Sequence, residues 1–231
     1  MPRIRHVGSV LAAVAVFFVV SACGGSGRNS GPSTDSLQPS YHGPAQQLIT
    51  VVSGSPTHTA GRLTAWQRNG DRWVRVFGPL HADLGADGIG VANETTAHTP
   101  AGTWPLTEAF GIQPNPGTRL PYRQVTDKDW WVSDPASAYY NTHYTCAPGT
   151  CPFKEEDGED LGEAGPAYDH AVVIDYNRSP VVPGNGSAIF LHVGDGNPTA
   201  GCVTVPGPTL VDVMRWLDPA DHPVIDISVA E

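Results

Sequence analysis

The chain has 231 residues, which is long enough for one domain with a sizeable core and a tight fit for two. Its formal net charge is −10, from 13 Lys and Arg residues against 23 Asp and Glu residues. Because no basic patch interrupts this acidic background, we expect no nucleic-acid partner.

The first residues have the anatomy of a secretory signal. Arg3 and Arg5 form a short basic region, residues 7–20 are almost entirely apolar, and the small residues Ser21 and Ala22 follow. A basic region, an apolar stretch and a small-residue cleavage point are typical of such a signal. The apolar stretch is shorter than the roughly 18 residues typical of a membrane-spanning helix. We therefore expect a signal peptide over residues 1–22.

Cys23 follows these small residues directly and resembles the cysteine of a bacterial lipobox, which is lipidated and becomes the first residue of the mature protein. An ordinary signal peptide with a chance cysteine is the alternative. Residues 23–45 are rich in Gly, Ser and Pro and predict a flexible tether, because they hold too few apolar side chains for a core. We expect an exported protein, lipid-anchored at Cys23 on the outer face of the cytoplasmic membrane, beside the cell wall.

Residues 46–231 form the expected folded domain. The chain holds 26 Gly and 22 Pro, so turns are dense and helix-length periodic segments are few, which favours an all-β architecture. Residues 209–217 predict one helix, with its apolar side chains on one face and Pro219 as its stop. The expected strands are Leu48–Val52, Arg62–Gln67, Trp73–Phe77, Ala171–Tyr176, Ala188–His192, Cys202–Val205 and Val224–Ser228.

The segment Lys154–Gly165 is crowded with carboxylate side chains. Calcium binding is conceivable, but the segment lacks the spacing of an EF-hand. We therefore expect a solvated acidic loop.

The cysteines divide into groups with different expected fates. Cys146 and Cys151 flank a turn-rich segment that could close a small disulfide loop in an oxidising compartment. Cys202 is then left alone. An unpaired cysteine in an exported protein is either buried and inert or reactive, and its surroundings have to decide between the two.

The residues around Cys202 favour reactivity. The apolar run 188–191 delivers His192 at a strand end, a loop of Gly, Asp, Asn and Pro follows, and Cys202 opens the next apolar run. Two strand ends joined by a tight loop can bring an imidazole beside a thiol, where it lowers the thiol pKa and accepts its proton. Taken singly, His192 reads as a structural histidine. The whole unit predicts a cysteine nucleophile with a histidine base.

Gly201 precedes the predicted nucleophile. Its missing side chain would let the backbone approach a reacting carbonyl, and the N–H groups of Gly201 and Cys202 could then stabilise the oxyanion. A simple turn is the alternative reading of this glycine.

With these residues in place, the sequence resembles the L,D-transpeptidase catalytic domain family, also known as the YkuD or ErfK/YbiS group. A histidine, a Gly-rich loop and the Thr-x-Gly-Cys-Val motif at residues 199–203 carry the resemblance. Further similar segments are Thr99–Leu106, Trp131–Ser137 with Tyr140 and Asn141, and Tyr168–Asn177. The similarity covers roughly Leu48 to Val229.

The resemblance implies a mainly β sandwich or barrel with one or two short helices. It also implies that Cys202 attacks a peptidoglycan stem peptide at its third residue, releasing D-Ala and forming a thioester. The amine of a second stem would take the acyl group to make a 3→3 crosslink, with His192 as the base. No cofactor and no metal are implied, and we expect a monomer.

The sequence departs from the family pattern near the nucleophile. Many members have a histidine where Ala200 stands and an arginine close to the position of Thr204, so a divergent, actinobacterial-type lipoprotein branch is expected. The group that binds the substrate carboxylates is therefore open, with Arg119, Arg123 and Arg178 as candidates. The other residues considered for substrate binding are Tyr168, His170, Gly194 and Thr199.

Three other functions fit parts of the sequence. Water in place of the amine would make the protein an L,D-carboxypeptidase. A non-catalytic wall-binding lipoprotein would account for the missing arginine. A zinc peptidase could draw on His170, His192, Asp195 and Cys202, although no His-Glu-x-x-His motif is present.

Overall fold

The computed structural model describes residues 38–230, so the expected signal peptide, the expected lipidation site Cys23 and most of the expected tether lie outside the described residues. Within this part, Gln38 exchanges two hydrogen bonds with the backbone of Trp73, at 2.9 and 3.1 Å. No helix of the described part is long and apolar enough to cross a membrane.

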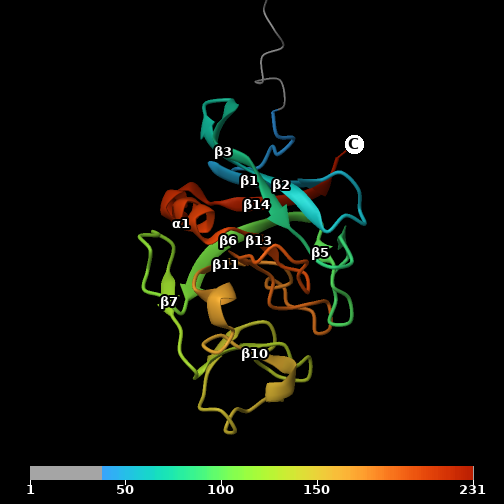
Figure 1. Ribbon diagram of the computed structural model, residues 1–231, viewed down its shortest axis with the longest axis vertical. Coiled ribbons are helices and arrows are strands. Elements are labelled where there is room, and N and C mark those ends of the chain that lie inside the picture. The colour runs from blue at the N-terminus through green and yellow to red at the C-terminus, as the bar shows by residue number, and fades with distance from the viewer. Residues whose placement is uncertain (1–37, 231) are drawn as a thin grey trace, which may run out of the picture. The chain divides into compact units, whose positions relative to one another are not determined.

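The fold is mainly β, as predicted (Figure 1). Nine strands form one sheet in the order β11-β12-β13-β3-β2-β1-β14-β6-β7, and a further β11–β6 pairing closes it into a barrel, with β7 beside β6. The bounds are β1 (Gln47–Ser53), β2 (Ala60–Asn69), β3 (Arg72–Asp83), β6 (Gly102–Gly111), β7 (Tyr122–Gln124), β11 (Ala171–Ile174), β12 (Phe190–Val193), β13 (Val203–Val205) and β14 (Val224–Val229). A short parallel pair joins β4 (Ile89–Gly90) to β5 (Thr99–Pro100).

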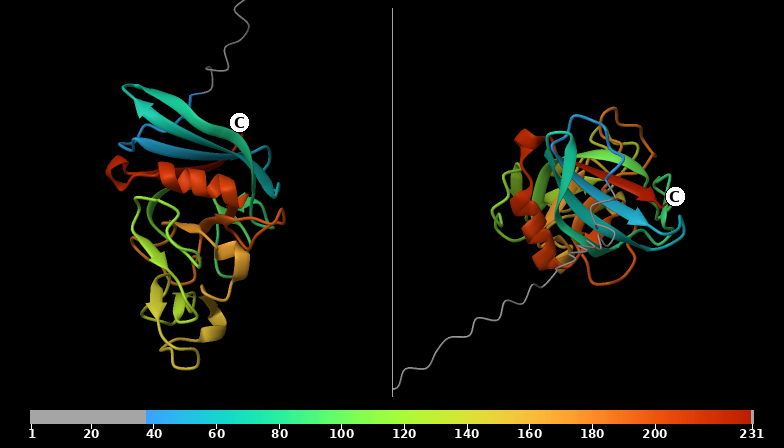
Figure 2. Two further views of the ribbon diagram at one scale, coloured as in Figure 1. Left: turned by 60° about the vertical axis from the view of Figure 1, so that its left-hand side comes forward. Right: turned by 90° about the horizontal axis from the view of Figure 1, so that it is seen from above.

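The single α-helix of residues 38–230, α1 (Gly207–Trp216), covers the barrel next to β1–β3 (Figure 2). Leu210, Val213 and Met214 are buried on its inner face, which the predicted periodicity placed there. They join the apolar side chains of β1, β2, β11 and β12 in the main core. The helix ends at Trp216, and the 3₁₀ helix η3 (Pro219–Asp221) follows.

Two expected strands begin later than predicted. β12 starts at Phe190 because Ala188 adopts the left-handed conformation, with φ of 54°. β13 starts at Val203, so Cys202 lies just outside the ladder. β11 also stops early, at Ile174.

β6 is a central strand that the sequence analysis missed. It pairs with β14, β11 and β7, although Pro105 interrupts its sequence and proline is normally excluded from central strands. The ladder continues around this position: the Pro105 carbonyl accepts from the Asp175 amide at 3.0 Å, and the next amide, of Leu106, donates to the Pro223 carbonyl at 2.9 Å.

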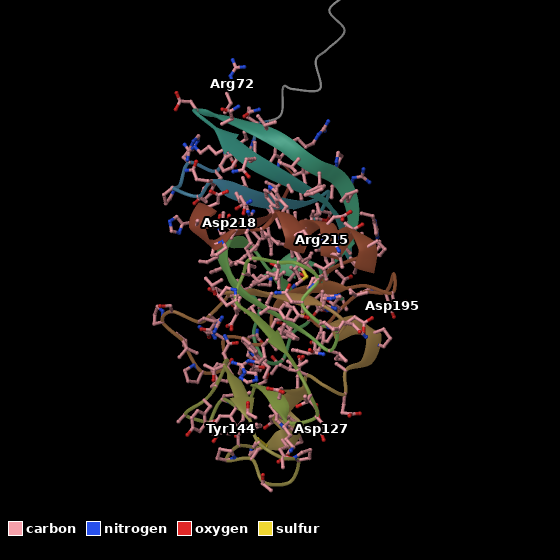
Figure 3. The ribbon with its side chains drawn as sticks, turned by 90° about the vertical axis from the view of Figure 1, so that its left-hand side faces the viewer. Arg72, Asp127, Tyr144, Asp195, Arg215 and Asp218 are labelled. Atoms are coloured by element: carbon pink, nitrogen blue, oxygen red, sulfur yellow. A yellow bond between two sulfur atoms is a disulfide. The ribbon has the colours of Figure 1, made fainter. Side chains whose placement is uncertain are left out.

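A small sheet of three strands lies at the far end of the domain from the β2–β3 hairpin. It has the order β10-β8-β9, with β8 (Asp129–Val132), β9 (His143–Thr145) and β10 (Gly158–Asp160). Figure 3 shows Tyr144 and Asp127 at this end and Arg72 at the other. The prediction of a solvated acidic loop over residues 154–165 is partly wrong. This segment contains the 3₁₀ helix η1 (Glu155–Asp157) and β10, and only some of its carboxylates are exposed.

Cys146 and Cys151 form a disulfide beside this small sheet. Cross-linking a loop of this length is expected to stabilise the fold by about 2 kcal/mol, because it restricts the unfolded chain. Replacing both cysteines by serine should lower the free energy of unfolding by that amount in urea titrations. An unchanged unfolding midpoint would contradict this expectation.

Candidate active site

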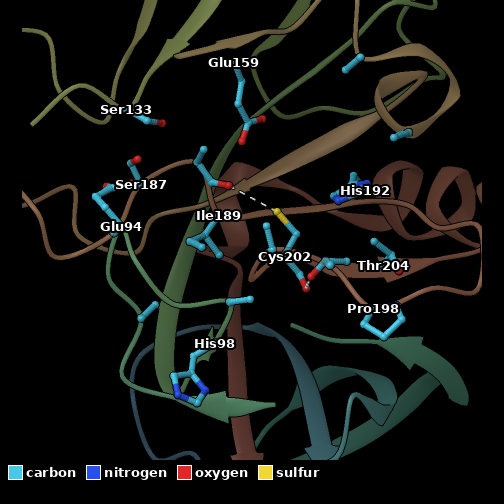
Figure 4. A pocket seen from close by; sticks show the side chains of 18 of the residues that line it. Glu94, His98, Ser133, Glu159, Ser187, Ile189, His192, Pro198, Cys202 and Thr204 are labelled. Carbon is cyan, nitrogen blue, oxygen red and sulfur yellow. Dashed lines mark hydrogen bonds between the residues drawn. The ribbon is translucent and has the colours of Figure 1, made fainter. Parts of the chain in front are cut away.

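One pocket of about 1210 Å³ contains both Cys202 and His192. Its walls come from the ends of β12 and β13, the loop between them, residues 92–98, and the β10 edge of the small sheet (Figure 4). The pocket therefore lies between the barrel and the small sheet.

Parallel pairing of β12 and β13 sets the relation between the two predicted catalytic residues. Leu191 lies opposite Val203 and His192 opposite Thr204. In this register Cys202 lies beside Phe190, two positions before the His192–Thr204 pair. Because side chains alternate along a strand, the two predicted catalytic residues project to the same face.

The Cys202 thiol is held by the chain just before β12. Its Sγ accepts a hydrogen bond from the Phe190 N–H at 3.3 Å and donates to the Ala188 carbonyl at 3.4 Å. Figure 4 shows the sulfur turned towards that carbonyl and towards Glu159, with His192 to the side. The structure does not place the His192 ring in hydrogen-bond contact with the thiol among the described residues.

Asn141, in the connection between β8 and β9, holds the backbone of Ala188, whose carbonyl accepts from the thiol. The Asn141 Oδ1 accepts from the Trp131 ring N–H at 2.9 Å and from the Ala188 amide at 3.2 Å. The same asparagine donates to the carbonyls of Tyr176 and Asn177. Through these contacts the segments 131–141 and 168–177 position the backbone of Ala188 beside the thiol.

Burial raises the pKa of the Cys202 thiol to about 12. The charge of Glu159 adds to the increase, and the Phe190 N–H opposes it. Only 8% of the residue is exposed. The resting thiol is therefore protonated at neutral pH and needs a base when it reacts.

His192 has the properties of such a base. Its Nδ1 donates to the Val193 carbonyl at 3.0 Å, so the neutral ring carries its lone pair on Nε2. Burial lowers the pKa of His192 below its ordinary value, against the opposing effect of the Val193 and Ala167 carbonyls and Asp195. The Tyr168 ring packs edge-on against the imidazole, with centroids 5.3 Å apart. The ring is thus neutral and fixed in orientation near pH 7.

The loop before Cys202 is braced by two threonines. Thr199 Oγ1 donates to the Cys202 carbonyl at 2.7 Å and accepts from the Gly201 amide at 3.1 Å. Thr99 Oγ1 accepts from the Gly85 amide at 2.7 Å and contacts the same Cys202 carbonyl at 3.4 Å. The Gly201 amide, a candidate oxyanion donor, is therefore engaged by Thr199 in the resting structure.

Glycine is required at two positions of the site. Gly201 has φ of 138°, and a Cβ there would lie 2.9 Å from the His98 carbonyl oxygen. A Cβ on Gly194 would lie 2.5 Å from Thr204 Oγ1. Gly194 lets the ends of β12 and β13 pack closely, and Gly201 lets the chain before Cys202 pack against the backbone of His98.

Gly201→Ala is expected to lower the free energy of unfolding by about 1–3 kcal/mol, since it combines a left-handed backbone with a backbone clash. Gly196→Ala is a matched control, because Gly196 also has a positive φ, of 86°, but open space around it. Urea unfolding should show the larger loss at Gly201. Equal losses would mean that the contact with His98 has no effect.

The structure separates the other predicted site residues. Tyr168, Gly194 and Thr199 line the pocket, whereas His170 does not and faces the Pro114 carbonyl at 3.3 Å. The three candidate arginines lie outside the pocket lining. Arg178 pairs with Glu108 and Asp175, and Arg119 pairs with Asp218.

Three pocket residues escaped the sequence analysis. Glu159 was read as part of a solvated loop, yet its carboxyl enters the pocket and accepts a hydrogen bond from the Tyr168 hydroxyl. His98 and Ser187 also line the pocket, and their Nδ1 and Oγ atoms are buried with no hydrogen-bond partner in the described part of the chain. Only His98, which directly precedes the Thr99 segment, had a signal in the sequence.

Within residues 38–230 no three His, Cys, Asp or Glu side chains lie together as a metal site. Of the four residues considered for zinc, His170 lies outside the pocket that holds the other three. The arrangement can instead supply a thiol, a neutral imidazole and a carboxyl to one bound molecule.

Comparison with known proteins agrees with this description. The family model of the L,D-transpeptidase catalytic domain, YkuD, matches residues 50–225, which is most of the described domain. No curated protein and no solved structure matches the chain.

Proposed function

Because the chain belongs to the YkuD family of L,D-transpeptidase catalytic domains, which act on peptidoglycan stem peptides, we propose that it crosslinks such stems through Cys202. The observation that carries the proposal is one pocket holding a buried thiol and a neutral imidazole whose Nδ1 is fixed as a donor. Cys202 is the nucleophile and His192 the base.

In the first step, the thiol proton passes to His192 Nε2 as the sulfur attacks the carbonyl of the third stem residue. The C–S bond forms, the C–N bond to D-Ala breaks, and the imidazolium returns the proton to the departing amine. A thioester remains on Cys202. A thiol that is protonated at rest fits this order of steps, because the thiolate then forms only when both the base and the substrate are in place.

The oxyanion of this step needs N–H donors beside the sulfur. We assign this role to the backbone amides of Cys202 and Gly201. The Gly201 amide now donates to Thr199 Oγ1. It becomes available to the oxyanion when the Thr199 side chain rotates away on substrate binding.

In the second step, the amine of another stem attacks the thioester and forms a 3→3 crosslink. The protein acts as a monomer, exported by its signal peptide and lipid-anchored at Cys23. This places the pocket beside its polymeric substrate at the outer face of the cytoplasmic membrane.

The test is to incubate the protein with a disaccharide tetrapeptide and identify the products by mass. We expect a crosslinked dimer that has lost one D-Ala. A tripeptide without dimer would mean an L,D-carboxypeptidase, in which water replaces the amine. No product from a folded protein would mean that the domain only binds the wall.

A further inference from the structure

Glu159 enters the pocket from the small sheet rather than from the barrel. It lies in β10 directly opposite Trp131 of β8, in the register of that pair. In Figure 4 its carboxyl points into the pocket on the side towards which the Cys202 sulfur is turned. The pairing with β8 therefore fixes a carboxyl in front of the nucleophile.

Tyr168 holds this carboxyl in place. Its hydroxyl donates a hydrogen bond to Glu159 Oε2, and its ring packs against Phe110, Phe190 and His192. Burial raises the pKa of Tyr168 well above its ordinary value, so the hydroxyl stays a donor. In the described part of the chain Glu159 Oε1 has no hydrogen-bond partner, which leaves one carboxyl oxygen for a ligand.

The pocket offers this carboxyl no permanently charged cationic partner. Its lining includes no lysine and no arginine, and Glu159 is the partly buried member of its five acidic residues, the other four being exposed. The Glu159 charge also contributes to raising the pKa of the Cys202 thiol, which works against a thiolate nucleophile. A carboxylate in this place is useful only if a cation joins it during the reaction.

The acyl acceptor of the proposed reaction is such a cation, because an aliphatic amine is an ammonium ion near neutral pH. We propose that Glu159 binds the ammonium group of the acceptor stem and takes its first proton. Glu159 thereby favours an amine over water as the group that attacks the thioester. This inference rests on the proposed function and concerns its second step.

The proton balance needs two acceptors. An ammonium ion loses two protons when it becomes an amide nitrogen. Glu159 takes the first, which leaves a neutral amine that forms the C–N bond as the C–S bond breaks. His192 takes the second and passes it to the departing Cys202 sulfur. The Glu159 proton then leaves to solvent, so one amide, one thiol and one released proton result. Burial raises the pKa of Glu159, which suits a group that must hold a proton briefly.

Glu159→Gln tests this assignment, because it keeps the size of the side chain and removes its charge. Two quantities are measured on the full chain: the rate of acylation of Cys202 by a carbapenem-type β-lactam, and the ratio of dimer to tripeptide from a disaccharide tetrapeptide. The first needs no acceptor amine and the second depends on it. Glu163→Gln is the matched control, since Glu163 is exposed on the same segment and outside the pocket lining.

We expect Glu159→Gln to keep or increase the acylation rate, by less than about tenfold, because the thiol loses a neighbouring negative charge. The ratio of dimer to tripeptide should fall about tenfold or more, and Glu159→Asp should restore part of it. The control should change neither quantity.

An unchanged ratio in a folded Glu159→Gln protein that acylates normally would overturn the inference and leave the proposed function standing. A parallel loss of acylation and ratio would also overturn it, because it would make Glu159 a structural residue. If the unaltered protein were not acylated by the β-lactam and formed neither dimer nor tripeptide from the stem, the proposed function itself would fail.

Discussion

Cys202→Ser is expected to abolish acyl-enzyme formation, with a loss of at least about 10⁴-fold in the rate of stem crosslinking. Serine is the sharper replacement because its hydroxyl can keep both hydrogen bonds of the thiol, from the Phe190 N–H and to the Ala188 carbonyl. The variant should therefore fold like the parent while lacking the sulfur nucleophile. Product formation from disaccharide tetrapeptide, followed by mass, measures the loss.

Cys202→Ala serves as the companion variant. It leaves the Phe190 N–H without its partner in a buried site, which is expected to cost about 1–3 kcal/mol of stability. Its activity should be as low as that of the serine variant although its stability differs. If either variant still formed crosslinked dimers, the nucleophile would have to be another group.

His192→Gln is expected to lower the acylation rate by about 10²–10⁴-fold, because no base remains to take the thiol proton. The pH profile should change as well. The imidazole must be neutral to act, and burial lowers the pKa of His192, so acylation of the unaltered protein should fall with decreasing pH only below the ordinary value of 6.5. In the variant this acidic limb should vanish, and the residual rate should rise towards the thiol pKa of about 12.

His170→Gln is the matched control for this substitution, because His170 faces the Pro114 carbonyl away from the pocket. It should leave both the rate and the acidic limb unchanged. A His192→Gln protein that kept the parent's acidic limb would show that another group is titrating, and His192 would lose its role.

The sequence predicted the strands whose apolar residues run without interruption, and it predicted α1 from its buried face. It did not predict β6, because Pro105 and the polar residues of Gly102–Gly111 hide a strand that becomes central only through its tertiary partners. It also suggested a tight loop between the strands of His192 and Cys202. The strands are parallel, and the loop between them bonds to the end of β3 through the Thr199 amide and the Leu84 carbonyl.

The placement of Cys202 and His192 in one pocket was predictable because the eleven residues from 192 to 202 hold them both, with the glycine that precedes the cysteine. The position of Glu159 in the pocket was not predictable. It depends on the β8–β10 pairing and on the contact with Tyr168, and no local sequence pattern reveals either. The carbonyl that accepts from His192 Nδ1 belongs to Val193, the next residue.

Peptide mapping of the protein after brief incubation with a disaccharide tetrapeptide tests the central claim most directly. The account predicts that the peptide containing Cys202 gains the mass of the stem without its terminal D-Ala, through a bond that hydroxylamine cleaves as it does a thioester. A stem-derived mass on any other peptide, or crosslinked product that forms with Cys202 unmodified throughout the time course, would contradict it.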